Sequence, residues 1–190
     1  MATNTFIQKY NPDIHHRRSI RLKGYDYTKA GLYFITICTQ NRLCLFGEIE
    51  NGEIILNDPG IMIERQWREL IYRFDNIKSD DFVVMPNHFH GIVKFVGVPL
   101  VGTQNTEQPR TIVQPQGIAP TIGDVAGAFK SLTTNEYIRG VKNNGWLRFN
   151  KRLWQRNYYE HIIRNEKSYY QILEYIQTNP MKWQDDKYYV

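Results

Sequence analysis

The sequence has little cysteine and no long apolar run. Cys38 and Cys44 are the only two cysteines among 190 residues, so neither a disulfide framework nor a cysteine-rich zinc site is indicated. No apolar stretch approaches the roughly 18 residues that cross a bilayer, and the first residues lack the charged and then apolar plan of a signal peptide. A glycine-rich nucleotide-binding loop of the Walker type is also missing. These absences favour a cytoplasmic protein that contacts no membrane and uses no nucleotide cofactor.

The composition is typical of a folded domain with a polyanionic partner. Hydrophobic residues make up 42% and charged residues 23% of the chain, which predicts a single globular domain over 25–190. The formal net charge is +5, and a cationic protein gains free energy when it neutralises phosphates and releases their counterions. Aromatic residues reach 14%, and their faces can stack on the unpaired bases of single-stranded nucleic acid.

Basic residues gather in two places. The segment 1–24 shows little hydrophobic periodicity and is either a basic arm that contacts phosphate or a solvated, partly ordered tail. Its cations are Arg17, Arg18, Arg21 and Lys23. Arg152 and Arg156 add a basic edge to the predicted last strand, and this edge could face DNA.

Two histidines lie two residues apart at the start of an apolar run. Because successive side chains of a strand alternate between faces, His88 and His90 point to one side and Phe89 points to the other. This spacing suits a pair of metal ligands, since neutral imidazole is the commonest protein metal ligand. The alternative is a pair of hydrogen-bonded histidines on a half-buried strand.

Hydrophobic period and turn residues predict an α+β domain. The predicted elements are a strand at 32–38, a hairpin of 43–49 and 53–56 around Asn51-Gly52, a helix from Asp58 as N-cap, strands at 81–85 and 89–96, a helix after Pro120, a strand at 153–163 and a helix at 166–179. Without the hairpin and the last helix, this order is the ferredoxin-like β-α-β-β-α-β pattern. We therefore expect an antiparallel sheet with helices on one face, an inserted β-hairpin and an added C-terminal helix.

Two further features bear on function. The prolines and glycines of 97–120 predict a flexible loop or linker. On the final helix, Tyr175 and Asn179 lie four residues apart on the flank of the apolar face, which solvent and substrate can reach. Pro180 is expected to push Asn179 out of the helical region.

Five short motifs occur in order over roughly residues 20 to 183. They are Leu32-Tyr33-Phe34-Ile35-Thr36, Met85-Pro86-Asn87-His88-Phe89-His90-Gly91, Gly123-Asp124-Val125 through Phe129-Lys130-Ser131, Trp154-Gln155-Arg156-Asn157-Tyr158-Tyr159-Glu160-His161 and Tyr175-Ile176-Gln177-Thr178-Asn179-Pro180. Together they resemble the REP-associated tyrosine transposases, a family of single-tyrosine HUH transposases. The apolar Phe89 between the two histidines agrees with the HUH motif of that family.

The resemblance implies an enzyme that cleaves and rejoins single-stranded or hairpin DNA through a covalent 5′-phosphotyrosine, assisted by Mg²⁺ or Mn²⁺. Carried over to this sequence, it makes His88 and His90 metal ligands, Tyr175 the nucleophile and Asn179 a possible third ligand. The implied protein is a monomer or a homodimer, and it associates with the nucleoid when it is bound to DNA.

Other tyrosines and other functions stay open. Tyr158 and Tyr159 point to opposite sides of the predicted last strand. Tyr169 lies near the centre of the apolar stripe of the final helix, and Tyr170 lies on the flank away from Asn179. One alternative function is a non-cleaving protein, derived from a transposase, that binds DNA hairpins. Another is a zinc-dependent hydrolase built on the histidine pair, for which no third strong ligand is evident in the sequence.

Overall fold

The computed structural model describes residues 30–96 and 120–190. The predicted basic arm 1–24, with Arg17, Arg18, Arg21 and Lys23, lies outside these ranges, as does the predicted loop 97–120 except for its last residue. The described elements, with η for a 3₁₀ helix, are β1 (Gly31–Cys38), η1 (Gln40–Arg42), β2 (Gly47–Glu50), β3 (Glu53–Leu56), α1 (Asp58–Leu70), η2 (Ile71–Arg73), β4 (Ile77–Met85), β5 (His88–Phe95), α2 (Ile122–Asn143), β6 (Tyr159–Ile163), α3 (Glu166–Thr178) and η3 (Pro180–Asp185). None of the helices in the described ranges is long and apolar enough to cross a membrane.

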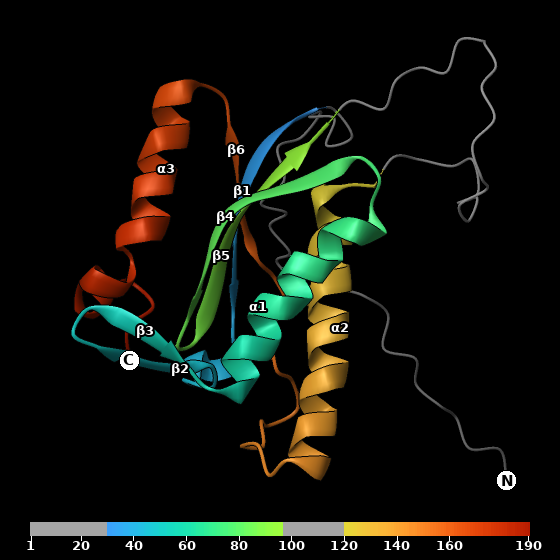
Figure 1. The fold of residues 1–190 in the computed structure, drawn as a ribbon, viewed down its shortest axis with the longest axis vertical. Helices are drawn as coiled ribbons and strands as arrows, with labels where there is room; N and C mark the ends of the chain where they lie inside the picture. The colour runs from blue at the N-terminus through green and yellow to red at the C-terminus, as the bar shows by residue number, and fades with distance from the viewer. Residues whose placement is uncertain (1–29, 97–119) are drawn as a thin grey trace, which may run out of the picture.

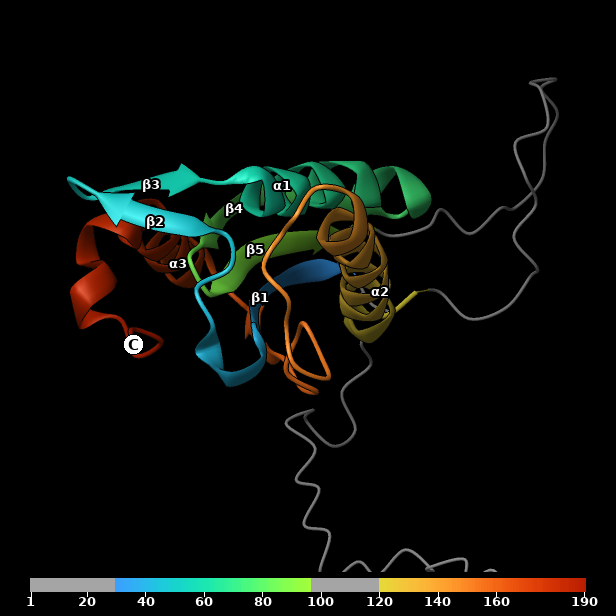
Figure 2. The same cartoon turned by 90° about the horizontal axis from the view of Figure 1, so that it is seen from below.

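Four strands form one antiparallel sheet in the order β4-β5-β1-β6. The helices α1 and α2 lie on one face of this sheet and α3 lies on the other (Figure 1). The strands β2 and β3 pair with each other in a separate hairpin that leads into α1 (Figure 2). This is the split β-α-β-β-α-β arrangement with an inserted hairpin and an added C-terminal helix, so the predicted fold class is confirmed.

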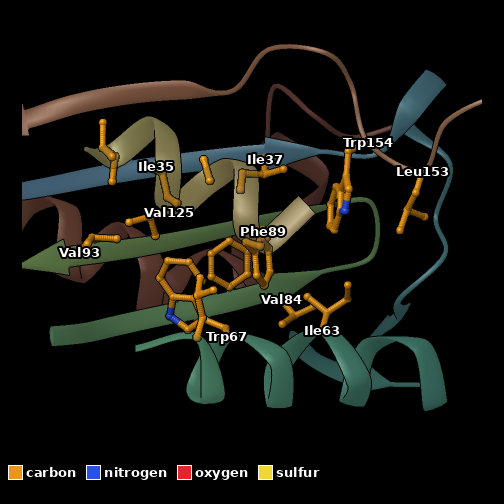
Figure 3. Close-up of a cluster of buried hydrophobic side chains, with 14 of the residues drawn as sticks. Ile35, Ile37, Ile63, Trp67, Val84, Phe89, Val93, Val125, Leu153 and Trp154 are labelled. Carbon is orange, nitrogen blue, oxygen red and sulfur yellow. The ribbon is translucent and has the colours of Figure 1, made fainter. Parts of the chain in front are cut away.

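The larger core lies between the sheet and the layer of α1 and α2 (Figure 3). Phe89 of β5 packs against Trp67 of α1 and Phe129 of α2, with ring centroids 4.6 and 4.9 Å apart. Gly91 permits this packing, because a Cβ at that position would lie 2.9 Å from the Phe89 ring and 3.0 Å from Trp67. Burying each large aromatic side chain contributes about 2–3 kcal/mol of transfer free energy. The core therefore holds β5 in one register. The side chains of β5 that point away from this core face α3.

A second, smaller core lies between the sheet and α3. Its buried members are Phe34, Ile92, Ile163 and Ile176. Because side chains alternate along a strand, Ile92 shares its face of β5 with His88 and His90. The histidine pair thus lies on the α3 side of the sheet, away from the larger core.

The predicted turn of the hairpin is confirmed, but the predicted cap of α1 is wrong. Asn51 and Gly52 both have positive φ, 52° and 82°, as a type I′ turn requires. Asn57, not Asp58, caps α1, because Oδ1 of Asn57 accepts the backbone N–H of Gly60 at 3.0 Å. Asp58 is the first residue of the helix itself.

The last strand of the sheet is shorter than predicted. It begins at Tyr159 instead of Leu153, and the residues before it make only a single bridge, between Trp154 and Thr39. Leu153 and Trp154 are buried in the larger core. The Lys130 ammonium donates to the backbone carbonyls of the three residues after Trp154. Core packing and this lysine hold the segment in an irregular path that side-chain alternation does not indicate.

The chain keeps helical geometry at Asn179, contrary to the prediction. Asn179 has φ −57° and ψ −43°, and Pro180 takes the first position of η3, where its missing N–H leaves no bond unmade. The turns of η3 carry the chain toward β5, so that the Trp183 ring lies 5.9 Å from the His88 ring, between centroids. This continuation brings the last residues of the chain to the histidine pair.

Candidate active site

One tyrosine and two histidines meet on the α3 side of the sheet. His88 and His90 come from β5, and Tyr175 comes from α3. The Tyr175 hydroxyl oxygen lies 3.2 Å from Nε2 of His90, and the Nε2 atoms of the two histidines are 2.9 Å apart. Both histidines are almost fully buried, whereas 36% of Tyr175 is exposed. The structure thus brings together the predicted metal ligands and the predicted nucleophile, with the tyrosine open to solvent.

Asn87 determines which nitrogen of His88 carries the proton. The amide nitrogen of Asn87 donates to two backbone carbonyls, at 3.2 and 2.9 Å, so its Oδ1 faces Nδ1 of His88, at 2.8 Å. An amide oxygen only accepts, and therefore Nδ1 of His88 is protonated and Nε2 presents a lone pair. Thr36 Oγ1 lies 2.8 Å from Nδ1 of His90 and can accept from it in the same way. Such partners orient an imidazole for metal binding.

Burial keeps both imidazoles neutral. It lowers the pKa of His88 to about 4, and together with the neighbouring His88 it lowers the pKa of His90 well below its usual range. A histidine must be neutral to bind a metal. Two nitrogens that are each about 2.1 Å from one ion, at a right angle, are about 3.0 Å apart, and the observed separation of 2.9 Å fits such a pair.

Asp186 completes a group of three residues that could hold a metal ion. One ligand atom each from His88, His90 and Asp186 lie within 4.8 Å of one another. Oδ2 of Asp186 accepts the Tyr175 hydroxyl at 3.2 Å, so the carboxylate contacts the tyrosine beside the histidines. Sequence reasoning missed Asp186, because an acidic residue near the end of a chain, outside any motif, is usually solvated. Asp186 is thus a candidate third ligand for the histidine pair that was not evident in the sequence.

Asn179, the predicted third ligand, is buried beside this group. Its Nδ2 donates to Oδ2 of Asp186 at 2.8 Å. Exchanging the oxygen and nitrogen of the amide would place two acceptors face to face, so Asp186 determines the orientation of the amide. The Oδ1 atom is buried and has no hydrogen-bond partner among residues 30–96 and 120–190. The ligand role of Asn179 stays a prediction.

The Tyr175 hydroxyl is held in its protonated form. Burial raises the pKa of Tyr175, and the charge of Asp186 and its hydrogen bond raise it further. A positive charge beside the phenol acts in the opposite direction, because it stabilises the phenolate. A cation held by the two imidazoles and the carboxylate would therefore make Tyr175 a better nucleophile.

Comparison with known proteins gives a sequence relative and structural neighbours. No protein-family model matches the chain. A Haemophilus influenzae protein described as uncharacterized is 46% identical over 186 residues, which cover 96% of this chain and 98% of the relative, so the two belong to one family. A structure described as a REP-associated tyrosine transposase bound to a REP hairpin matches with a TM-score of 0.56 and 21% identity, over 88% of this chain and 77% of that chain. The chain has the fold of a REP-associated tyrosine transposase. This match supports the resemblance that the sequence motifs carry.

In this transposase fold, Arg152 and Arg156 are exposed on the loop before β6. The loop is attached to the end of β1, where the Gln155 N–H donates to the Cys38 carbonyl at 2.9 Å. Cys38 is the register partner of His88. The two arginines therefore belong to a loop that borders the histidine end of the sheet, and their contact with DNA stays a prediction.

The other tyrosines considered as nucleophiles lie in different surroundings from Tyr175. Tyr169 donates to a carboxylate of β4 at 2.8 Å, and Tyr170 is 55% exposed. Tyr158 packs against the larger core, whereas Tyr159 is exposed with its ring centroid 6.3 Å from Phe34. The opposite orientations predicted for Tyr158 and Tyr159 agree with these contacts.

Proposed function

We propose that the protein cleaves and rejoins single-stranded DNA through a covalent phosphotyrosine at Tyr175. The observation that carries this proposal is the position of the Tyr175 hydroxyl, 3.2 Å from both Nε2 of His90 and Oδ2 of Asp186. A nucleophile in contact with a carboxylate and with one imidazole of a candidate metal-binding pair is an arrangement suited to metal-assisted phosphoryl transfer. The family resemblance and the transposase fold support the same reaction.

Hairpin DNA is the proposed substrate. The structural neighbour is described as bound to a REP hairpin, and the formal net charge of +5 favours a polyanion. A hairpin joins a duplex stem to unpaired strands, and the unpaired part can enter a site on one face of a sheet. The wider reaction class is transposition.

We place a divalent cation, Mg²⁺ or Mn²⁺, on His88, His90 and Asp186. The fit rests on the neutral imidazoles, on their converging Nε2 atoms and on the carboxylate within 4.8 Å. Two nitrogen donors favour Mn²⁺ over Mg²⁺. When bound, such a cation polarises the phosphate and offsets its negative charge. Asn179, through its unpartnered Oδ1, is the alternative oxygen ligand.

In the proposed step, the oxygen of Tyr175 attacks the scissile phosphorus. The phenolic O–H bond and the P–O3′ bond break, which leaves a 5′-phosphotyrosine and a DNA 3′-hydroxyl whose proton comes from solvent. Oδ2 of Asp186 already accepts the hydrogen bond of the phenol and is placed to receive its proton. Rejoining reverses these changes, and because the phosphotyrosine keeps the bond energy, no nucleotide cofactor is needed.

The test is a covalent-adduct assay. The full chain is incubated with labelled single-stranded DNA hairpins from the flanks of its own coding sequence, with Mn²⁺ or Mg²⁺, and run on a denaturing gel. We expect an adduct that EDTA, His88→Ala and Tyr175→Phe each abolish. Tyr170→Phe, a change of the same kind on the same helix at an exposed position, is the matched control and should leave the adduct intact.

The other outcomes of this assay select the alternatives. An adduct that survives Tyr175→Phe would move the nucleophile to another tyrosine, with Tyr159 next in line. Tight hairpin binding without an adduct in either metal would contradict strand transfer and establish the non-cleaving DNA-binding function.

A zinc-dependent hydrolase is the second candidate, because two histidines and a carboxylate are also a donor set of catalytic zinc. Metal analysis of the purified protein separates the two functions. A hydrolase predicts one tightly held Zn²⁺ per chain and DNA cleavage that needs no Tyr175, whereas the proposed transferase predicts activity that Mn²⁺ or Mg²⁺ restores after EDTA treatment.

A further inference from the structure

Three cations gather around Cys38, the last residue of β1. Arg42 is in η1, Lys130 is in α2 and Lys187 follows Asp186, and the charge of each acts on the Cys38 thiol. Lys130 is partly buried and donates to three backbone carbonyls, while Arg42 and Lys187 are exposed. Within residues 30–96 and 120–190, none of the three cations forms an ion pair.

Two arginines of α1, on the other face of the sheet, are paired with carboxylates. Arg65 pairs with Glu69 and Glu136, and Arg68 pairs with Glu64 at 2.7 Å. These ion pairs, which are all those found in the described part of the chain, lie on α1 and α2. The charges of Arg65 and Arg68 are therefore neutralised, whereas those of Arg42 and Lys187, near the histidines, have no ion-pair partner in the described ranges.

Aromatic rings hold Lys187 without neutralising it. Its Nζ lies 5.2 Å from the ring centroid of Tyr159 and 4.8 Å from that of Tyr188. A ring attracts a cation through its quadrupole but carries no net charge. The ammonium is thus kept in position while its full charge stays available to an anion.

Arg42 is held beside Lys187 in a similar way. Its Nη1 donates to the Lys187 carbonyl at 3.0 Å, and its guanidinium lies 5.9 Å from the Tyr188 ring centroid. The φ angle of Arg42 is 55°, a left-handed conformation that few residues other than glycine adopt. Strained backbone conformations of this kind cluster at ligand sites.

The two cations lie next to the candidate active site. The Tyr188 ring, which contacts both of them, has its centroid 4.7 Å from that of His88. The Tyr159 ring contacts Phe34, and the Phe34 ring lies 6.1 Å from the Tyr175 ring, between centroids. The Tyr188 ring therefore lies between the two cations and His88, and the rings of Tyr159 and Phe34 connect Lys187 to Tyr175.

We propose that Arg42 and Lys187 form a phosphate-binding site for single-stranded DNA, next to the phosphate that Tyr175 attacks. The site would take the adjoining phosphodiester of the same strand and so hold the scissile bond at the tyrosine. This proposal rests on the proposed function for the identity of the scissile phosphate. The binding of DNA to Arg42 and Lys187 is measured separately from strand transfer.

The experiment measures how DNA affinity depends on salt. The full chain carrying Tyr175→Phe, which excludes covalent trapping, is titrated into fluorescein-labelled single-stranded DNA at several salt concentrations. Each phosphate contact on a single strand contributes about 0.7 to the slope of log K against log [salt]. Because the two cations share one phosphodiester, we expect the double variant Arg42→Gln/Lys187→Gln to lose about 0.7 of this slope and to bind all sequences more weakly.

The matched control is Arg139→Gln/Lys142→Gln, which removes the same two charges from exposed positions of α2. It should keep the slope, and Arg42→Lys/Lys187→Arg should restore most of it. A slope for Arg42→Gln/Lys187→Gln equal to that of the control would overturn the phosphate site. A lost slope, together with the absence of an adduct in either metal when the chain keeps Tyr175, would instead keep the phosphate site and reject strand transfer.

Discussion

Replacing Asp186 by asparagine would remove the negative charge from the candidate metal group and keep the size of the side chain. Asp186 is the only acidic member of the described group with His88 and His90. Its carboxylate also accepts the Tyr175 hydroxyl and the Asn179 amide. Asp186→Asn therefore changes both the affinity for a cation and the state of the nucleophile.

The size of the effect follows from these contacts. Removing a group that only supports a metal ligand costs about 10–100-fold in affinity, so losing a charged ligand is expected to cost at least about 100-fold, or about 2.8 kcal/mol. Because Asp186 raises the pKa of Tyr175, the same change also lowers that pKa. We expect weaker metal binding and a reduced adduct yield that added Mn²⁺ partly restores.

Isothermal titration of the metal-free protein with Mn²⁺ measures the first effect directly. Asp185→Asn, an equal loss of charge at the exposed neighbouring position, is the control and should leave the affinity unchanged. Suppose that Asp186→Asn binds Mn²⁺ with an affinity within about threefold of that of Asp185→Asn, while His88→Ala binds no Mn²⁺. Asp186 is then not a metal ligand. Asn179→Ala would then show whether the amide takes that place.

Two further predictions concern stability. The folded protein holds the pKa of His88 near 4, below the ordinary 6.5, so the unfolded chain binds more protons between these values. The free energy of unfolding of the metal-free protein should therefore fall by up to about 1.4 kcal/mol per pH unit per histidine as the pH drops from 6.5 toward 4. Urea titrations at pH 7 and pH 5 that give equal free energies of unfolding would contradict this prediction. Gly60→Ala should destabilise by about 1–3 kcal/mol, because its Cβ would lie 2.0 Å from the Phe46 carbonyl oxygen. Gly127→Ala, with nothing within 4 Å of its Cβ, is the control in the same urea titration and should stabilise by up to about 1 kcal/mol.

The features that sequence alone determined are local. Strand alternation put His88 and His90 on one face, and the Asn51-Gly52 pair specified the hairpin turn. The helix predicted after Pro120 is present as α2, and it begins with a capping box, since the Asp124 carboxylate accepts the Thr121 N–H at 2.7 Å. Each of these signals depends on neighbours within a few residues, where backbone geometry restricts the choices. The order of such elements was sufficient to predict the sheet and its helices.

Tertiary structure decided how the site is completed. Asp186 reaches the histidines because η3 continues past Asn179 and turns the chain toward β5, which no local period indicates. Arg42 and Lys187 are 145 residues apart in sequence and yet hydrogen-bonded. The shortened last strand has the same origin, since burial of Trp154 outweighs its β propensity. Contacts between residues so distant in sequence depend on how the whole core packs, and the short periods of a sequence do not encode that packing.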